Sequence, residues 1–266
     1  MAYYICINGW AYPSSINLKD ALNHAKFIGF ECFETNLEEE DLKLSDEEFK
    51  KKWKDIKKYV DDIGIHTRTV CTGLYWRYNP IVNLEEGLNV AKKHLLMASI
   101  LEAKVILLVP GVAIPELSYD ENIYKAKQFV EKVGKMGEDY GVNIGVENVW
   151  NRMLVSPVEM KSFIESINMK NVGVYFDIGN MSMVTHPEHW IKILGNLILA
   201  IHAKDFNTRS LSFGIPLTGT VNWKGVRKAL DEIHYSGTIT AEISPYVGDP
   251  YKAVLDTFNA LKQIFG

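Results

Sequence analysis

The second half of the chain carries four side chains that can bind a metal or move a proton, each at the end of a short apolar segment. They are Glu147, Asp177, His202 and Glu242. Carboxylates serve as general acids and bases, and carboxylates and imidazoles are common ligands of divalent metals. Burying three carboxylates close together without a counter-charge would be very costly. If the fold gathers these four side chains, the pattern predicts a site for one divalent metal ion.

Each of the four residues has a simpler explanation when it is considered alone. A glutamate at a strand end can meet water or a helix N-terminus, and Asp177 precedes Ile178, Gly179 and Asn180 in a segment that suits a turn. A single histidine in an apolar strand is usually a hydrogen-bonded core residue. The recurrence of such residues at the ends of four successive predicted strands is what favours a shared site.

The elements that must position these residues are predicted from the apolar pattern. Eight apolar, β-branched segments are candidate strands: residues 4–8, 32–36, 67–72, 105–109, 143–147, 172–177, 198–202 and 238–243. Their hydrophobicity is continuous rather than alternating, which is typical of parallel strands covered on both faces. Segments of helical period lie between them. Ser45 with Glu48 fits a capping box, and Gly64 and Gly141 stand where helices should end.

Eight strand–helix units in 266 residues predict an α/β protein with a single (β/α)₈ TIM barrel, residues 1–266 forming one domain. The alternative is an open doubly wound sheet, which usually has a glycine-rich phosphate turn after its first strand. The segment NGWAYP at that place, residues 8–13, lacks this turn. In a TIM barrel the chemistry lies at the carboxyl ends of the strands, so the four side chains would meet at one end.

Charge and composition exclude several classes of partner. The net charge is −4 and the 29 basic residues are scattered, so neither nucleic acid nor anionic lipid is expected. No signal peptide and no apolar run of about 18 residues is evident, so no membrane partner is expected either. Cys6, Cys32 and Cys71 are odd in number and widely spaced, and we expect buried free thiols in a cytoplasmic protein.

Five segments together carry a family resemblance: GVEN, GVYFDIGN, IHAKDF, GTVNW and TAEIS, at residues 145–148, 173–180, 201–206, 219–223 and 240–244. They resemble the xylose isomerase-like superfamily of TIM barrels, and within it the sugar-phosphate isomerase/epimerase group that includes the ketose 3-epimerases. The resemblance covers essentially the whole chain and is most specific in its second half. It implies that the four residues above hold one divalent metal, and that Glu147 and Glu242 are also the catalytic acid/base pair.

The resemblance implies a divalent-metal-dependent epimerase or isomerase of a ketose or ketose phosphate, acting through a metal-stabilised cis-enediolate. Three carboxylates and one imidazole favour Mn²⁺, with Mg²⁺ or Co²⁺ as substitutes, over Zn²⁺. Two carboxylates on different strands can act on opposite faces of a carbon, which inverts it. A single carboxylate would move the proton between neighbouring carbons, which is isomerisation. On a dication, both Glu147 and Glu242 are expected to be ionised before turnover.

Two basic residues after the seventh strand are candidates for substrate binding. Lys204 follows His202 by two positions, so both point to the same side of an extended strand. Lys204 can reach a substrate oxygen or a phosphate, or it can pair with Asp205 or another carboxylate. Arg209 is a candidate by position, since related epimerases place an arginine near the substrate in this loop.

Four further residues are candidate substrate contacts. Asn180 stands where the tagatose-type epimerases carry a substrate-binding histidine, a departure that argues against tagatose-like specificity. Trp10 and Trp76 offer aromatic rings for the C–H face of a sugar. Glu34 ends the second predicted strand, where a structural hydrogen bond is the alternative to a substrate contact.

Three other functions fit parts of the pattern. A metal-dependent dehydratase of the sugar or inosose type would use the same metal and a related intermediate. An apurinic-site endonuclease-like nuclease needs a trinuclear zinc cluster with more histidines, and Asn180 stands in place of one of them. A catalytically idle binding barrel would not need all four metal-binding residues. The expected partner is a small sugar or sugar phosphate, and the family leads us to expect a homo-oligomer, a dimer or tetramer.

Overall fold

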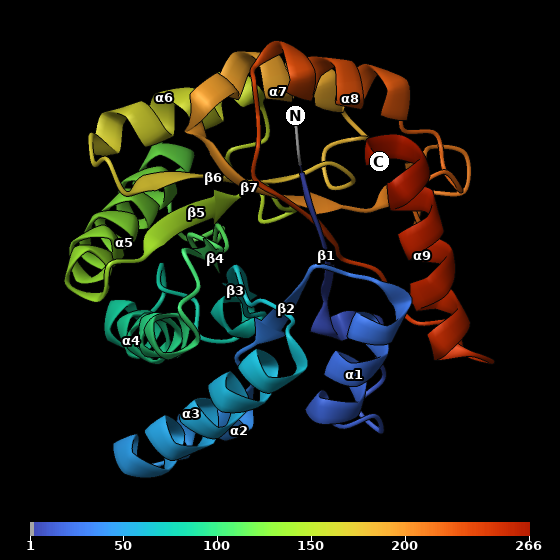
Figure 1. The fold of residues 1–266 in the computed structure, drawn as a ribbon. Helices are drawn as coiled ribbons and strands as arrows, with labels where there is room; N and C mark the ends of the chain where they lie inside the picture. Colours follow the sequence, from blue (N-terminus) through green and yellow to red (C-terminus); the bar gives the residue numbers. More distant parts are fainter. Residues whose placement is uncertain (1–2) are drawn as a thin grey trace.

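The computed structural model describes residues 3–266, and its centre is a closed barrel of eight parallel strands surrounded by helices (Figure 1). Around the barrel the strands follow the order β1-β10-β7-β6-β5-β4-β3-β2. The predicted α/β TIM barrel is therefore confirmed. The strands are β1 (Tyr4–Asn8), β2 (Cys32–Asn36), β3 (Thr69–Cys71), β4 (Val105–Leu108), β5 (Asn143–Glu147), β6 (Val172–Asp177), β7 (Ile198–Ala203) and β10 (Thr238–Ala241).

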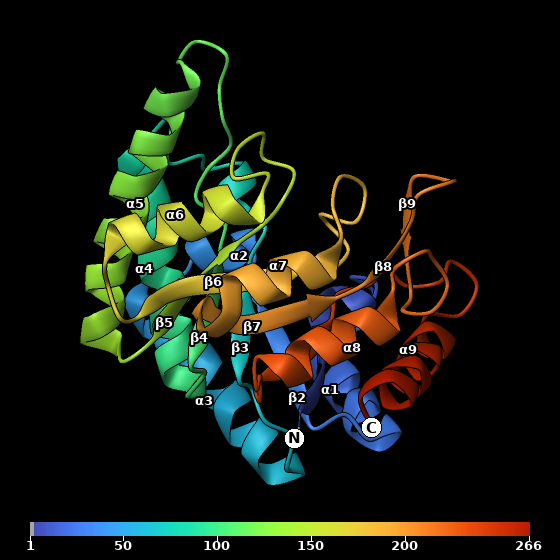
Figure 2. The same ribbon diagram turned by 90° about the horizontal axis from the view of Figure 1, so that it is seen from above.

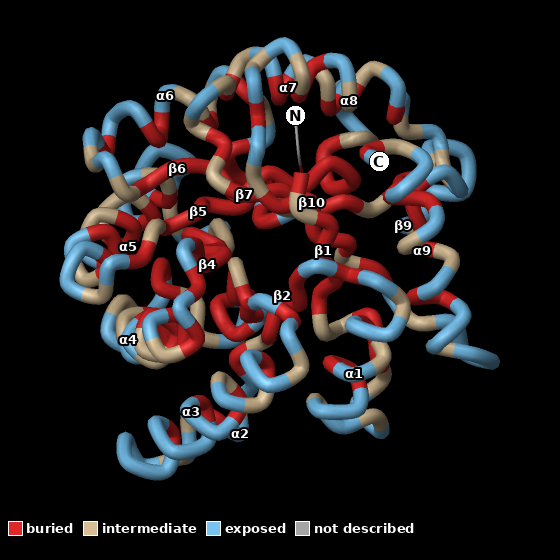
Figure 3. Tube along the Cα trace, viewed as in Figure 1, coloured by how far each residue is buried: buried red, intermediate tan, exposed pale blue. Residues whose placement is uncertain are grey.

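The helices cover the outside of the barrel and turn their apolar faces toward it. The barrel strands are buried almost throughout, whereas each helix is exposed along its outer face (Figure 3). No helix within residues 3–266 is both long and apolar enough to cross a membrane. The helices are α1 (Leu18–Ile28), α2 (Glu39–Leu42), α3 (Asp46–Ile63), α4 (Leu84–Leu101), α5 (Tyr119–Tyr140), α6 (Pro157–Ile167), α7 (Pro187–Leu194), α8 (Trp223–Glu232) and α9 (Pro250–Phe265).

The helices begin and end at signals that the sequence carries. At the start of α3, Ser45 accepts a hydrogen bond from the Glu48 N–H while the Glu48 carboxylate accepts one from the Ser45 N–H. This is the predicted capping box. Gly64 and Gly141 end α3 and α5 with φ of 67° and 66°, a left-handed conformation that glycine adopts without strain.

A small hairpin after β7 was not predicted. It consists of β8 (Asp205–Asn207) and β9 (Ser212–Gly214), which pair in antiparallel fashion outside the barrel. In Figure 2 the hairpin projects above the strands, while the N-terminal end of β1 lies at the opposite end of the barrel. The hairpin therefore stands at the carboxyl ends of the strands, beside the region where the candidate site is expected.

The expectation of three free thiols is wrong for two of the cysteines. Cys6 of β1 and Cys32 of β2 are register partners on neighbouring strands, with Cα atoms 4.5 Å apart, and they form a disulfide. Cys71 is free and buried. The sequence does not reveal the register between the first two strands, so the proximity of Cys6 and Cys32 could not be read from their spacing.

A buried histidine outside the candidate site gives a first testable prediction. His94 lies on the inner face of α4, with Nδ1 3.3 Å from the Tyr75 hydroxyl, and burial lowers its pKa to about 3. The unfolded chain takes up a proton near pH 6.5, before the folded protein does, so folding stability falls as the pH drops from about 6.5 toward 3. Between pH 7 and pH 4.5 the free energy of unfolding of the wild type should fall. In the variant with leucine in place of His94, this fall should be smaller by about 2–3 kcal/mol.

Urea denaturation of the wild type and of His94→Leu at the two pH values measures this difference. Comparing each protein with itself at two pH values separates proton binding from any packing change that the substitution causes. An equal pH effect in both proteins would show that His94 does not stay neutral in the folded state.

Candidate metal centre and active site

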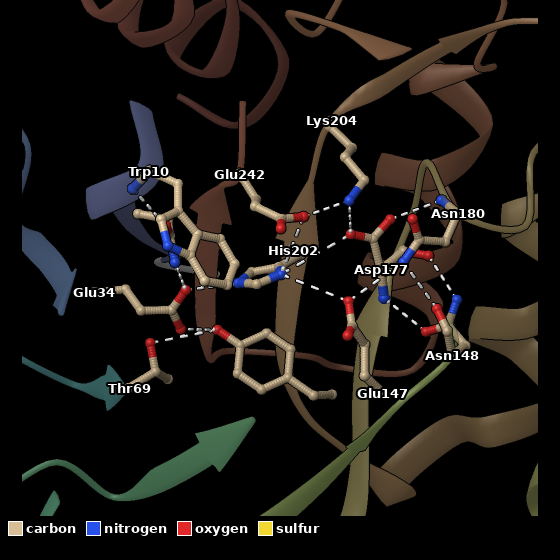
Figure 4. A network of polar contacts seen from close by, with 12 residues as sticks. Trp10, Glu34, Thr69, Glu147, Asn148, Asp177, Asn180, His202, Lys204 and Glu242 are labelled. Atoms are coloured by element: carbon tan, nitrogen blue, oxygen red, sulfur yellow. Dashed lines mark hydrogen bonds and ion pairs between the residues drawn. The ribbon is translucent and has the colours of Figure 1, made fainter. Parts of the chain in front are cut away.

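The four residues predicted as metal ligands come together at the carboxyl ends of four strands that lie side by side in the barrel. Glu147 and Asp177 are the last residues of β5 and β6, His202 is the penultimate residue of β7, and Glu242 directly follows β10. Asp177 and His202 are register partners on neighbouring strands. The order β10-β7-β6-β5 puts the two glutamates at the outer positions of this row, with His202 and Asp177 between them (Figure 4).

The ligand atoms converge on one point. One donor atom from each of the four residues lies within 4.8 Å of all the others. The Nδ1 atom of His202 lies 3.6 Å from Glu242 Oε2, 3.9 Å from Asp177 Oδ2 and 4.0 Å from Glu147 Oε1. Donor atoms at such separations surround a space of the size that one divalent cation needs when it binds all of them at about 2.1–2.3 Å.

One buried polar atom at this point makes no hydrogen bond. It is Nδ1 of His202, whose ring is fully buried. Buried polar atoms in proteins are nearly always paired, so a ring nitrogen that faces three carboxylates without a hydrogen bond needs a reason. A divalent cation supplies one, since it would bind Nδ1 and compensate the carboxylate charges. The donor set therefore fits a metal.

The protein's own charges set the pKa values of the two glutamates far apart. Burial, followed by the charges of Glu242 and Asp177, raises the pKa of Glu147 to about 8. Burial also opposes ionisation of Glu242, but the Lys204 ammonium and His202 outweigh it and lower the pKa of Glu242 to about 2. Two carboxyl groups whose pKa values diverge in this way are a recurrent arrangement of a proton acceptor and a proton donor.

Lys204 and His202 compensate the carboxylate charges. Lys204 Nζ lies 3.0 Å from Asp177 Oδ2 and also forms an ion pair with Glu242. Burial disfavours the charged form of Lys204, but Asp177 and Glu242 outweigh it and raise its pKa. Burial likewise opposes protonation of His202, but Glu34 and then Glu242 raise its pKa to about 9. A metal bound at His202 would displace this proton.

Asp205 is not the partner of Lys204. It is fully buried and turned toward the segment before α8, where it accepts hydrogen bonds from the backbone N–H groups of Leu217 and Val221 and from the Trp223 indole. Of the alternatives for Lys204, the structure bears out pairing with another carboxylate. These hydrogen bonds hold the backbone in place directly after β7. Because Lys204 precedes Asp205, they also help to set the direction in which the Lys204 side chain extends.

An asparagine pair holds the carboxylates in place. Asn148 donates to the Asp177 carbonyl at 2.8 Å and accepts from the Asp177 N–H at 2.7 Å, which joins the ends of β5 and β6. The Asn180 N–H donates to Asp177 Oδ1 at 2.7 Å, and the Asn180 side chain donates to Glu147 Oε1 at 3.3 Å. Asn180 thus touches two predicted metal ligands. Sequence reasoning missed Asn148, although its place directly after Glu147 in the segment GVEN was a signal.

Glu34 lies beside His202, on the side of the imidazole ring opposite Asp177 and Glu147 (Figure 4). Its side chain is fully buried, and its Oε2 is 2.6 Å from His202 Nε2. Of the two alternatives for Glu34, the structure favours the structural hydrogen bond over a substrate contact. The side chains of Asn8 and Tyr175 also donate to its carboxylate, at 2.5 Å each.

Two cavities are lined by predicted metal ligands. A small one of about 90 Å³ is lined by both glutamates together with Asn180, Lys204, Trp10 and Trp76. A larger one of about 360 Å³ shares Trp10, Lys204 and Glu242 with the first. The small cavity thus brings six predicted residues to the same space: Trp10, Trp76, Glu147, Asn180, Lys204 and Glu242. Neither cavity is lined by Glu34 or Arg209.

The larger cavity is also lined by residues that sequence reasoning missed. Phe213 of the hairpin and Tyr246 after β10 supply aromatic surface, and Ser244 supplies a hydroxyl. The Phe213 ring lies 4.9 Å from the Lys204 ammonium and packs against Trp150 at 5.1 Å between ring centroids. Arg209, in contrast, is exposed in the turn of the hairpin. Its role in substrate binding stays a prediction.

Comparison with known protein families identifies the class of protein. The model of the xylose isomerase-like TIM barrel family matches residues 22–264, and the chain belongs to this family. The family resemblance drawn from the sequence is thereby confirmed. Because members of one barrel family carry different activities, the family alone does not give the reaction.

Relatives with curated sequences give more particular likenesses. An uncharacterised protein of Methanocaldococcus jannaschii is 32% identical over 158 residues, which span 53% of this chain and 51% of that protein, so the match extends over about half of either one. A probable L-ribulose-5-phosphate 3-epimerase, UlaE, of Mycoplasma pneumoniae is 24% identical over 271 residues, covering 95% of this chain and 86% of the relative.

Solved structures share the fold. An L-ribulose 3-epimerase superimposes with a TM-score of 0.83 at 15% identity, over 100% of this chain and 95% of that one. The IolI protein with a bound zinc atom gives a TM-score of 0.84 at 19% identity, with 98% of each chain covered. At these identities the likeness establishes the shared barrel.

Proposed function

We propose that this protein is a divalent-metal-dependent epimerase or isomerase of a ketose or ketose phosphate. The observation that carries the proposal is the placement of Glu147 and Glu242 at the carboxyl ends of β5 and β10, on either side of His202 and Asp177, with both carboxylates lining one cavity. The likeness to a probable ketose-phosphate 3-epimerase over 95% of the chain supports it.

The predicted ligands are Glu147, Asp177, His202 and Glu242, whose carboxylate-rich set favours Mn²⁺ and accepts Mg²⁺ or Co²⁺. The zinc atom bound by the similar IolI barrel makes Zn²⁺ a further metal to test, although a single imidazole favours it less. When bound, the metal polarises the substrate carbonyl and stabilises the negative charge that develops as the α-proton leaves.

The chain's own residues supply the proton transfers and the binding surface. One glutamate removes the α-proton and the other returns a proton to the opposite face, so that the carbon is inverted. The Lys204 ammonium, which lines the small cavity, would donate a hydrogen bond to a substrate oxygen, and the Asn180 side chain donates one to Glu147 Oε1 at 3.3 Å. The indole rings of Trp10 and Trp76 pack on the C–H face of the sugar. We also propose that the protein is cytoplasmic and homo-oligomeric, and that its chain forms one domain.

Incubation of the protein with Mn²⁺ and a panel of ketoses and ketose phosphates in D₂O tests the reaction. Epimerisation is expected to place one deuterium on the inverted carbon of the product, because the two glutamates exchange their protons with solvent between turnovers. NMR and mass spectrometry of the sugars locate the label.

The other outcomes of this experiment each identify a different function. Deuterium on two neighbouring carbons with interconversion of aldose and ketose would show isomerisation. Loss of water would show a dehydratase. A panel in which no sugar exchanges any proton would contradict the proposal and favour a binding barrel.

A further inference from the structure

We propose that Glu34 is the positioning residue of His202: its carboxylate holds the proton on Nε2 of the imidazole and so directs the Nδ1 lone pair at the metal centre. The inference rests on the proposed metal site and deepens it. It replaces the substrate contact that the sequence predicted for Glu34.

The two nitrogens of His202 face different surroundings. Nε2 lies 2.6 Å from Glu34 Oε2, a hydrogen-bond distance. Nδ1 faces three carboxylates at 3.6–4.0 Å and has no hydrogen-bond partner. The imidazole can therefore bind Glu34 through one nitrogen and a metal through the other, which is the carboxylate–histidine–metal arrangement that fixes a tautomer.

The surroundings of Glu34 require it to act as an acceptor. The Tyr175 hydroxyl lies 2.5 Å from its Oε1, and the Asn8 amide nitrogen lies 2.5 Å from its Oε2. The orientation of the Asn8 amide is fixed, because its oxygen accepts from the Trp10 N–H at 2.8 Å and from the Asn36 side chain at 3.3 Å. Asn8 must therefore donate to Glu34. A carboxylate that accepts from Asn8 and Tyr175 leaves its remaining lone pairs for a third donor, the Nε2–H of His202.

The ring plane of His202 is fixed as well. The Tyr175 ring packs edge-on against the imidazole, with ring centroids 4.6 Å apart, and its hydroxyl reaches the same carboxylate that binds Nε2. The imidazole is thus held by the packed ring of Tyr175 and by the hydrogen bond between its Nε2 and Glu34. The protein therefore fixes the direction in which Nδ1 points before any metal arrives, which avoids the cost of ordering a mobile side chain.

A second metal between Glu34, Cys71 and His202 is the competing explanation, since their donor atoms also lie within 4.8 Å of one another. Two observations argue against it. The Glu34 oxygens are already occupied by the hydrogen bonds from Asn8, Tyr175 and His202. Cys71 is fully buried, and burial, followed by the charge of Glu34, raises the pKa of its thiol well above its usual value, which disfavours the thiolate form that binds metals.

The test compares divalent-metal binding by the wild type and by Glu34→Gln, measured by calorimetry with Mn²⁺ and without any sugar. Glutamine keeps the shape of Glu34, but its amide group presents two N–H donors to a site that supplies donors. We expect Glu34→Gln to bind Mn²⁺ about 10- to 100-fold more weakly, the usual effect of losing the partner of a metal-binding histidine. Glu31→Gln is the matched control, because Glu31 is exposed and lies one residue before β2, and the metal affinity of this variant should be unchanged.

A spectroscopic measurement separates positioning from a general structural effect. In ¹⁵N-histidine-labelled protein loaded with diamagnetic Mg²⁺, the wild type should show His202 protonated at Nε2 alone, and Glu34→Gln should lose this single tautomer. Tyr175→Phe keeps the ring and removes one donor to Glu34. It is expected to keep the tautomer and to lose only a few-fold in metal affinity.

The outcomes separate this inference from the proposed function. A wild type that binds no divalent metal would contradict the proposed function itself. A folded Glu34→Gln with wild-type affinity and the Nε2 proton in place would overturn the positioning role alone. If circular dichroism shows that Glu34→Gln does not fold, Tyr175→Phe decides, and wild-type metal affinity in that variant would overturn the inference.

Discussion

Removal of the divalent metal is expected to lower kcat/KM of the proposed epimerisation by at least about 10³-fold, because polarisation of the carbonyl contributes several kcal/mol to transition-state stabilisation. Without the metal, the positive charges at the site are Lys204 and a protonated His202, whose pKa of about 9 keeps its ring charged at neutral pH. These two cations compensate the carboxylates. Neither of them is placed to bind a carbonyl oxygen and a hydroxyl together.

The measurement uses one preparation of the wild type. It is treated with a chelator, desalted, and assayed before and after addition of Mn²⁺, Mg²⁺, Co²⁺ or Zn²⁺. Restoration by one or more of the ions is the expected result, with Mn²⁺ the most effective. A chelated protein that keeps full activity, with no residual metal by elemental analysis, would refute the metal site.

The same preparation allows a control that does not depend on the choice of sugar. Metal at 100 times its dissociation constant stabilises the folded state by about 2.7 kcal/mol, which corresponds to a rise of about 5–10 °C in Tm for a chain of this size. An ion that restores activity should also raise Tm, since it binds the carboxylates that repel one another in the folded protein. A protein with no change in Tm for any of the ions would contradict the presence of a folded metal site.

The positions of the four ligands were predictable because they depend on local pattern. Each follows a continuous apolar segment, and the parallel barrel brings the ends of such segments to one end of the molecule. Asp177 and His202 are register partners, so two predictions based on separate segments meet in one pair of strands. The pattern alone did not establish that the four residues share one metal ion. The family resemblance indicated this grouping.

Contacts between distant strands were not predictable from the sequence. Glu34 binds His202 across 168 residues of chain and Tyr175 across 141, and the sequence offers no measure of which inward-facing side chains are opposite one another. The same reason applies to the disulfide between Cys6 and Cys32, where the register of neighbouring strands decides. The hairpin after β7 was missed because its strands are three residues each and β9 is largely exposed, so that it lacks an apolar pattern.

Glu147→Gln and Glu242→Gln are each expected to slow epimerisation by about 10²- to 10⁴-fold, the usual contribution of a general acid or base. Glutamine keeps a neutral oxygen ligand for the metal and cannot move a proton. The two carboxylates stand at the outer positions of the row β10-β7-β6-β5, and in the proposed reaction each would serve one face of the substrate. Each variant should therefore exchange deuterium into one epimer without inverting it, and the two variants should act on opposite epimers.

Asp177→Asn is the matched control for these two variants, because Asp177 is a predicted metal ligand between the glutamates and has no predicted role in proton transfer. Its amide oxygen can still accept from the Asn180 N–H, as Asp177 Oδ1 does at 2.7 Å. Raising the metal concentration should restore activity in Asp177→Asn and should leave the two glutamine variants inactive. If one glutamine variant loses all exchange while the other epimerises at the wild-type rate, a single carboxylate does the chemistry, and the proposed acid/base pair would be overturned.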